Sequence, residues 1–241
     1  MIKRHPAQET QEGAGVQVKR LMPIATMRNY DPFVLWDDFT ITPGHGFPTH
    51  PHRGFEAITY LFSGSLNHAD NLGNNSTVTG GGAQRFTAGR GLEHSEMPHE
   101  HAATRGIQFW INLPRRLKQI EPAYQQVNDG EFPVEEIEGG AVKVLVGDGS
   151  PLKILTPIRY LQIDLKADTQ YSVVIPAEMR GFLYVADGEV TLNQERYSAG
   201  DSAFFEDEPS LQLIAITPCR LMFACGQPHG EPIVQSGPYV D

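Results

Sequence analysis

Short runs of alternating hydrophobic and polar residues recur along most of the chain, and they predict β-strands rather than helices. In residues 56–62, Ile58 and Tyr60 would lie on one face of a strand, while Thr59 and Leu61 would lie on the other. Segments containing glycine or asparagine separate such runs and are typical of tight turns. Strands are predicted at residues 56–62, 66–70 and 106–113, with turns at residues 63–65 and 71–75.

A short internal repeat relates the two halves of the chain. Residues 53–64 begin with Arg-Gly-Phe and end in glycine, as do residues 180–188. An aromatic-hydroxyl-Ala-Gly sequence follows in each half, at residues 86–89 and 197–200. Two copies of one antiparallel β-barrel or jelly-roll unit explain this pattern, so we predict an all-β fold with two such domains.

We place the domains at residues 1–125 and 126–241, with residues 115–121, whose composition is compatible with a helix, opening the connection. A chain of 241 residues is long enough for one or two such domains. The 24 glycines and 18 prolines have no fixed period, and hydrophobic residues make up 40%. This composition is typical of many short strands joined by turns and excludes a disordered chain.

The formal charge of −10 opposes direct binding to a nucleic-acid backbone and favours small molecules or proteins as partners. Cys219 and Cys225 are too few for a disulfide framework and are interpreted as buried thiols. The N-terminus lacks the apolar core of a signal peptide, and no later run has the length of a membrane span. We therefore expect a cytoplasmic protein without membrane contact.

Two pairs of potential metal ligands stand out. His50 and His52 are two residues apart, as are His94 and Glu96, so each pair would face one side of an extended strand. Two such pairs facing each other would offer three imidazoles and one carboxylate. This set suits Fe(II), Mn(II), Ni(II) or Cu(II), with positions left for water, oxygen or substrate.

Chance is the alternative explanation, because nine histidines will often produce one such pair and surface histidines usually have no role. The presence of two matching pairs favours the metal site. His99 and His101 form a third pair in a polar turn, where we expect solvated side chains. The isolated histidines, expected to be structural or exposed, are His5, His45, His68 and His229.

The residues around these pairs also resemble a known family. Residues 44–56 are similar to the first cupin motif, Gly-x5-His-x-His-x3-Glu, with Gly64 one residue later than usual. The resemblance to the pirin family is more specific and spans nearly the whole chain. It rests on residues 31–39, 46–56, 87–98 and 230–239.

The resemblance implies a bicupin whose N-terminal barrel holds one metal ion through His50, His52, His94 and Glu96. Fe(II) is the expected ion, with Cu, Ni, Mn or Zn as alternatives. Ordinary cupins would use Glu56, which here becomes a supporting or structural group outside the ligand set. In the C-terminal copy, residues 175–177, Phe205 and Asp207 stand near the corresponding positions, so that barrel is expected to be metal-free.

Two features depart from the family pattern. Longer pirins continue beyond the position of Asp241 into a C-terminal helix, and the role of that helix is not transferred to this chain. Glu93 also stands beside His94 where the family usually has an apolar residue. By alternation Glu93 should face away from the metal, so we expect its side chain to be exposed.

The resemblance further implies a quercetin 2,3-dioxygenase, which opens the central ring of a flavonol with O2 and releases CO. Glu96 would accept a proton from the substrate. Phe47, Phe55 and the face of Ile58 and Tyr60 are candidates for the pocket wall or for plain barrel core. The alternatives are a redox-sensing iron protein that binds a protein partner, and a cupin enzyme with another substrate. A pocket wide enough for a three-ring flavonol would favour the enzyme.

Overall fold

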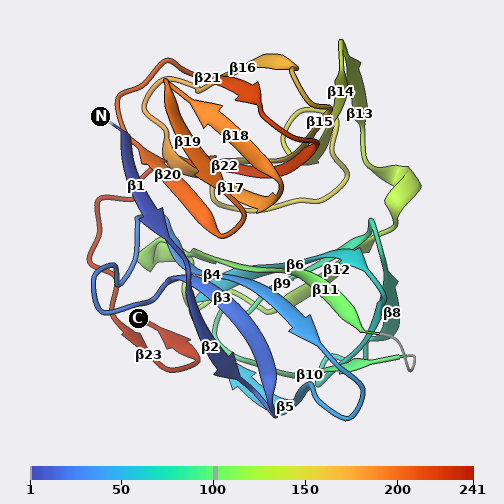
Figure 1. Cartoon of the computed structure of the whole chain (residues 1–241). Helices are drawn as coiled ribbons and strands as arrows, with labels where there is room; N and C mark the ends of the chain where they lie inside the picture. Colours follow the sequence, from blue (N-terminus) through green and yellow to red (C-terminus); the bar gives the residue numbers. More distant parts are fainter. Residues whose placement is uncertain (1, 100–102) are drawn as a thin grey trace. The chain divides into compact units, whose positions relative to one another are not determined.

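The computed structural model describes residues 2–99 and 103–241, which form 24 β-strands and two short 3-10 helices (Figure 1). The all-β prediction is confirmed. Contacts divide the chain into two units. The first unit comprises Gln8–Glu131 and His229–Asp241, and the second comprises Met1–Ala7 and Phe132–Pro228.

Two antiparallel sheets lie one above the other in the first unit (Figure 1). Its larger sheet has the order β12 (Ala123–Val127), β9 (Ala83–Thr87), β6 (Phe55–Ser63), β11 (Thr104–Asn112), β4 (Phe33–Ile41), β3 (Val16–Met22) and β2 (Gln8–Glu12). Its smaller sheet has the order β5 (Phe47–His52), β10 (Leu92–Pro98), β7 (Ser65–Asp70) and β8 (Asn75–Thr79). The unit also contains η1 (Arg115–Leu117), η2 (Asp129–Glu131), β23 (Gln235–Ser236) and β24 (Tyr239–Val240).

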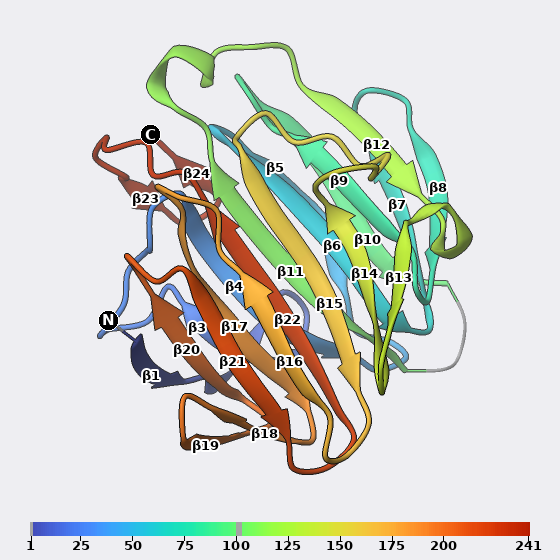
Figure 2. The same cartoon turned by 90° about the horizontal axis from the view of Figure 1, so that it is seen from above.

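The second unit repeats this plan with a larger and a smaller antiparallel sheet (Figure 2). The larger sheet has the order β1 (Ile2–Pro6), β20 (Asp201–Phe205), β17 (Arg180–Asp187), β22 (Cys219–Gly226), β15 (Ile158–Leu165), β14 (Gly140–Val146) and β13 (Val134–Ile137). The smaller sheet has the order β16 (Gln170–Val174), β21 (Ser210–Ala215), β18 (Glu189–Leu192) and β19 (Glu195–Ser198).

The two units are not separated by a single boundary such as one after residue 125, because a segment at each end of the chain belongs to the other half's unit. Strand β1 pairs with β20 and so joins the second unit, whereas residues 229–241 join the first. Pairing between strands far apart in the sequence places these two terminal segments, and no local sequence pattern predicts it. The helix-compatible stretch 115–121 forms only the single turn η1, which Pro114 precedes.

The internal repeat falls partly on equivalent strands. Strand β6 lies between β9 and β11, and β17 lies correspondingly between β20 and β22. The second part of the repeat is not equivalent, because residues 86–89 span the end of β9 whereas residues 197–200 precede β20. The counterpart of β10 is therefore β21, and the proposed correspondence of Phe205 and Asp207 with the ligands of β10 is wrong. The buried residues of β21, Leu211, Leu213 and Ala215, belong to an apolar core.

The predicted strand at residues 56–62 is confirmed as β6, which is buried on both faces. Gly64 and Gly73, both with positive φ, lie in the two predicted turns beside β7. Cys219 and Cys225 are buried free thiols, as predicted. Within the described part of the chain, no helix is long and apolar enough to cross a membrane.

Candidate metal centre

Pairing of β5 with β10 brings three of the predicted ligands together. His94 lies directly opposite His50 in the register, and Leu92 lies opposite His52. The imidazoles of His50, His52 and His94 each offer a nitrogen, and these atoms all lie within 4.8 Å of one another. Three imidazoles at this separation can converge on one metal ion.

The orientation of the rings fits a metal ligand set. His50 Nδ1 lies 2.8 Å from the carbonyl oxygen of Pro48, and His52 Nδ1 lies 3.4 Å from that of Pro238. Both rings thus keep Nε2 as the ligand atom. His94 Nε2 is buried without a hydrogen-bond partner among the described residues. A buried, unpartnered nitrogen is costly, and a metal ion at the cluster would satisfy it.

Aromatic side chains hold the imidazoles in place. The ring of His52 stacks on Phe86 with ring centroids 5.2 Å apart and an interplanar angle of 12°, and it meets Trp110 in a T-shaped contact with ring centroids 5.0 Å apart. Phe55 stacks on Trp110 at 4.1 Å. Phe86 also meets the His94 ring, with ring centroids 4.7 Å apart, so the two buried rings of His52 and His94 are positioned before any ion binds.

Glu96 stands apart from the histidine cluster. The β10 register shifts between His94 and Glu96, so Glu96 lies opposite Phe47. Its carboxylate is buried, and Oε1 accepts hydrogen bonds from Thr59 Oγ1 at 2.7 Å and Gln84 Nε2 at 2.5 Å. Glu96 lines the same pocket as His50 and His52, but its place in the ligand set is a proposal.

The other acidic candidates lie outside the cluster. Glu56 is buried, and its Oε1 accepts a hydrogen bond from Thr87 at 2.8 Å. Glu56 thus serves the structure of the barrel at this position. Glu93 is exposed, as predicted from the alternation along the strand.

The remaining histidines divide into three kinds. His45 and His99 are exposed, His5 and His229 are half-buried, and His101 lies outside the described residues. None of the four described ones belongs to the three-histidine cluster.

His68 is a buried neighbour of the cluster that the sequence pattern does not single out. Although it stands alone in the sequence, His68 is fully buried, and its ring centroid lies 5.3 Å from that of His94. Its Nε2 lies 2.9 Å from Asp70 Oδ2. The signal that was available is the spacing of His68 and Asp70, two residues apart on a predicted strand and hence on one face.

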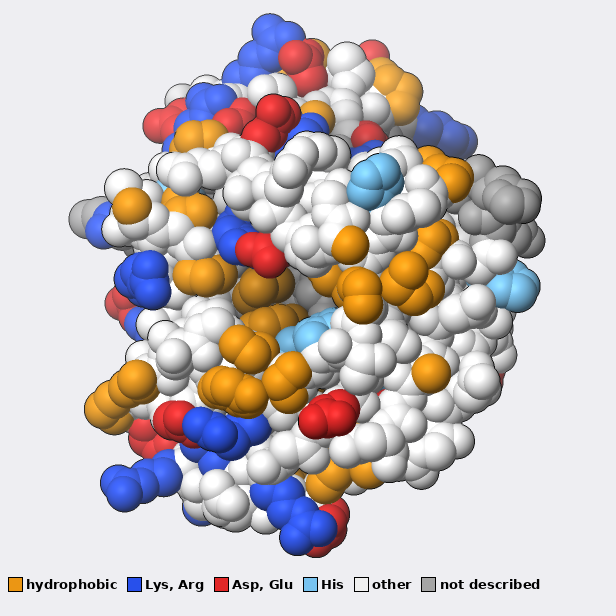
Figure 3. Space-filling view, turned by 90° about the horizontal axis from the view of Figure 1, so that it is seen from below, with side chains coloured by type: hydrophobic (Ala, Val, Ile, Leu, Met, Phe, Trp, Pro, Cys, Tyr) orange, Lys and Arg blue, Asp and Glu red, His pale blue; other side chains and the backbone are white. Residues whose placement is uncertain are grey.

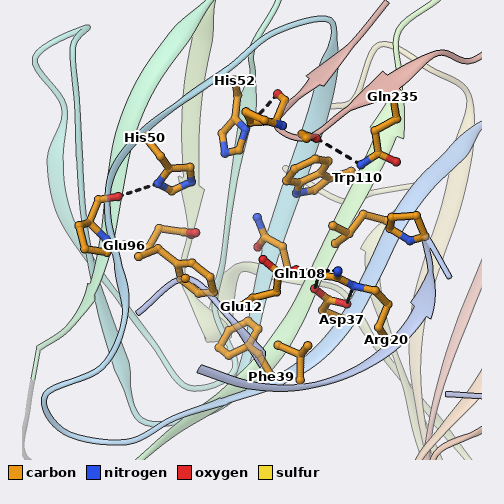
Figure 4. Close-up of a pocket in the computed structure, with 18 of the residues that line it drawn as sticks. Glu12, Arg20, Asp37, Phe39, His50, His52, Glu96, Gln108, Trp110 and Gln235 are labelled. Carbon is orange, nitrogen blue, oxygen red and sulfur yellow. Dashed lines mark hydrogen bonds and ion pairs between the residues drawn. The ribbon is translucent and has the colours of Figure 1, made fainter. Parts of the chain in front are cut away.

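A cavity of about 440 Å³ adjoins the cluster, within the first unit. Figure 3 shows a hollow around which hydrophobic side chains gather, with a histidine at its edge. In Figure 4, His50, His52 and Glu96 lie toward one end and Arg20 and Asp37 toward the other. The apolar residues of the wall include Leu35, Phe39, Phe47 and Trp110.

Of the candidates for the pocket wall, Phe47 lines the cavity, whereas Ile58 and Tyr60 of β6 belong to the buried core, the alternative given for them. Thr59 donates to Glu96, so the inward face of β6 carries the residues that alternate with Thr59. Ile58 and Tyr60 point to the opposite side of the sheet. Neither residue lines the cavity, and neither does Phe55, which packs beneath Trp110.

A buried ion pair forms the far end of the cavity. Arg20 Nε and Nη2 donate to the two carboxylate oxygens of Asp37 at 2.8 and 2.6 Å, and Arg20 Nη1 contacts Glu12 at 2.6 Å. Burial raises the pKa of Asp37 to about 6, although Arg20 opposes this shift. The pocket therefore combines apolar walls with one polar end.

The C-terminal segment, residues 229–241, closes one side of the cavity through Gln235, Gly237 and Pro238. Lys118 Nζ anchors it by donating to Val240 O, Gly54 O and Asn112 Oδ1 at 2.8, 2.9 and 2.8 Å. Burial lowers the pKa of Lys118 to about 8.

Two further contacts hold this segment. Asp31 accepts hydrogen bonds from the backbone of His229 and Gly230 at 3.1 and 2.9 Å. Gly54 has φ +85°, and a Cβ atom there would lie 1.8 Å from Val240 O. Only glycine permits the C-terminal segment to come this close to the turn between β5 and β6.

The buried ligands should make the metal-free protein sensitive to acid. Burial, with His50 nearby, lowers the pKa of His52 to about 3, and burial lowers that of His94 well below its usual value. The unfolded chain therefore binds protons that the folded chain excludes as the pH falls below about 6.5. The contribution of these histidines to the free energy of unfolding is highest above that pH and should fall by up to about 1.4 kcal/mol per pH unit for each histidine, partly offset by Asp37, whose raised pKa acts in the opposite direction.

Urea unfolding of the metal-free protein between pH 7 and pH 5 tests this expectation. Trp36 and Trp110 are the two tryptophans of the chain and both lie in the first unit, so their fluorescence reports on that unit. His94→Gln should flatten the pH profile, whereas His45→Gln should leave it unchanged. Equal slopes in all three proteins would contradict the assignment.

Two antiparallel β units, one of which carries a histidine cluster on its smaller sheet, define the protein as a bicupin. The sequence profile described as Pirin matches residues 15–111, and that of the Pirin C-terminal cupin domain matches residues 160–241. The chain belongs to the pirin family. Human pirin is 35% identical over 245 residues, which cover 97% of this chain and 84% of the human protein.

Solved structures of similar proteins agree with this assignment. A quercetin 2,3-dioxygenase from Acinetobacter baumannii has a TM-score of 0.90 and 25% identity, over 99% of this chain and 90% of that one. The bacterial pirin YhhW from Escherichia coli, crystallised in complex with nickel(II), has a TM-score of 0.81 and 26% identity. That similarity covers 95% of this chain and 100% of YhhW.

Proposed function

We propose that this pirin is a metal-dependent dioxygenase that cleaves the central ring of a flavonol with O2 and releases CO. The observation that carries the proposal is the three-histidine cluster beside a largely apolar cavity of about 440 Å³. Cavities of roughly 300–1,000 Å³ are typical of small-molecule sites. The similarity to the Acinetobacter baumannii quercetin 2,3-dioxygenase supports a flavonol as substrate.

His50, His52 and His94 would hold the metal through Nε2, and Glu96 would complete the set through the oxygen that Thr59 and Gln84 leave free. Fe(II) is our proposed ion, and Cu, Ni, Mn and Zn are the alternatives. The nickel(II) complex of YhhW supports a divalent transition metal at this position. When bound, the metal would polarise the substrate oxygens and provide the redox chemistry for O2.

The protein residues bind the substrate and move its proton. Leu35, Phe39 and Trp110 offer apolar surface to a flat aromatic molecule and keep water from it. The Glu96 carboxylate would accept the proton of the flavonol 3-hydroxyl, either as a loosely held ligand whose oxygen leaves the metal or through a water, because a carboxylate beside the reacting oxygen acts as a general base. Thr59 and Gln84 hold this carboxylate in position. No organic cofactor is required.

The rival function is a redox-sensing iron protein that binds a protein partner. The same three histidines would serve that role equally well. Access to the metal distinguishes the two, and a cavity of about 440 Å³ next to the cluster favours the enzyme. We propose a cytoplasmic location and no direct contact with nucleic acid, in keeping with the formal charge of −10.

Loss of quercetin absorbance in air, measured with protein reconstituted with Fe(II) or Cu(II), tests the proposal. We expect turnover in the wild type and none above background in the His50→Ala, His52→Ala double variant. Glu96→Gln should lower turnover by roughly 10²–10⁴-fold, the range typical of general-base catalysis.

Glu93→Gln provides the matched control, because the exposed Glu93 is the neighbouring carboxylate on β10 and its loss should leave turnover unchanged. Metal content is determined on the same samples. A full equivalent of metal in the wild type without quercetin loss would refute the flavonol dioxygenase and favour the sensor or another substrate.

A further inference from the structure

A buried row of polar side chains leads from β7 to the metal ligand His94. Asp70 lies opposite His94 in the β7–β10 register, and His68 lies opposite Glu96. The side chains of His68 and Asp70 are both fully buried, and His68 Nε2 lies 2.9 Å from Asp70 Oδ2. His68 Nδ1 lies 3.5 Å from His94 Nδ1, a long hydrogen bond.

The turn after β7 fixes the direction of this row. Asp70 Oδ1 accepts the backbone N–H groups of Leu72 and Asn74, both at 2.9 Å, and the Asn74 amide at 3.1 Å. Asp70 Oδ2 accepts the Asn74 amide at 2.8 Å and faces His68 Nε2. A carboxylate accepts only, so the His68 proton that meets it must lie on Nε2.

The consequence reaches the metal ligand. With its proton on Nε2, His68 presents Nδ1 as an acceptor, and His94 must then carry its own proton on Nδ1 to make the contact. His94 Nε2, the atom without a hydrogen-bond partner, is left with its lone pair toward His50 and His52.

We propose that Asp70 and His68 are positioning residues that fix the tautomer of His94 for metal binding. This inference rests on the metal site of the proposed function and on no particular substrate. Tyr124 supports the arrangement, since its ring stacks on His68 at 4.2 Å with an interplanar angle of 17°. Partners of this kind raise the basicity of a ligand, and their loss typically lowers metal affinity by roughly 10–100-fold.

Asp70→Asn gives a sharp test because it is nearly isosteric and should reverse the donor and acceptor roles in the hydrogen bonds from residue 70 through His68 to His94. The Oδ1 site has three donors and the Oδ2 site has two, so the asparagine oxygen should occupy the Oδ1 site. Its NH2 group would then donate to His68 Nε2. His68 would carry its proton on Nδ1 and donate to His94 Nδ1, leaving the proton of His94 on Nε2 and blocking the ligand atom.

His68→Phe is the companion variant, because a phenyl ring keeps the stacking on Tyr124 but can impose no tautomer on His94. We expect the Kd for Ni(II), measured by competition with a chromogenic chelator, to rise by about 100-fold in Asp70→Asn and by about 10-fold in His68→Phe. In the double variant the Kd should return to the value of His68→Phe. A purely structural role predicts the opposite order, since His68→Phe is the larger change.

Urea unfolding of each metal-free variant, followed by tryptophan fluorescence, shows that the first unit is folded in the sample used. Unchanged Kd values in the variants, or a double variant weaker than Asp70→Asn, would overturn the positioning role while leaving the metal site intact. A wild type that binds no Ni(II) would overturn the metal site and the positioning role together. The test measures Ni(II) affinity and not quercetin turnover, so failure of the flavonol proposal can be told apart from failure of the positioning role.

Discussion

His94→Ala is expected to abolish stoichiometric metal binding, with an apparent affinity at least about 100-fold below that of the wild type. His94 is the imidazole contributed by β10, whereas His50 and His52 both come from β5. Its removal leaves two imidazoles from β5 and at most the Glu96 carboxylate from β10, a set that binds a divalent transition metal more weakly than three imidazoles do. Elemental analysis after equilibrium dialysis against Fe(II) or Ni(II) measures the effect.

His45→Ala is the matched control for this experiment. His45 is exposed in the same unit and lies outside the cluster, so its variant should keep a full equivalent of metal. Circular dichroism of the metal-free samples verifies that both variants are folded. Full metal content in His94→Ala would show that the three-histidine cluster is not the metal centre.

Lys118→Met is expected to lower the free energy of unfolding of the first unit by about 3 kcal/mol or more. The substitution removes a buried ammonium and leaves the oxygens of Gly54, Asn112 and Val240 without this donor. Buried acceptors that lose their partner each cost roughly 1–3 kcal/mol. Urea unfolding followed by tryptophan fluorescence measures the loss in that unit.

Lys118→Met should also weaken metal binding. Lys118 anchors the C-terminal segment, whose Pro238 oxygen contacts His52 Nδ1. We therefore expect weaker metal binding together with lower stability. Lys19→Met makes the same chemical change at a partly exposed position on β3 and should alter stability by less than about 0.5 kcal/mol. Equal effects of the two substitutions would contradict the anchoring role.

Local sequence patterns were sufficient to predict strands such as β6 and to single out the three histidines of the cluster. Alternation of hydrophobic residues identifies β6, because successive side chains of a strand face opposite sides. The same geometry turns the spacing of His50 and His52 into two imidazoles on one side of β5. These features depend on residues within a few positions of one another, and the sequence contains that information directly.

Alternation alone did not show which face of β6 points inward. It separates Ile58 and Tyr60 from Thr59, but both sets are buried because β6 lies in the middle of its sheet and is covered on both sides. The hydrogen bond from Thr59 to Glu96 identifies the inward face. The match of residues 197–200 with residues 86–89 misidentified the counterpart of β10 for a similar reason. Which strands of the two units are equivalent follows from their pairing and not from a short sequence match.

The sequence by itself determined the all-β class, the two-unit plan, the pirin resemblance and the residues that supply the imidazoles. Only the tertiary structure brought His68 and Asp70 next to His94 and shifted the register between His94 and Glu96. It also brought residues 229–241 against β5. Each of these depends on register between strands far apart in the chain. Register is decided by the joint packing of all strands in the unit, which no short segment encodes.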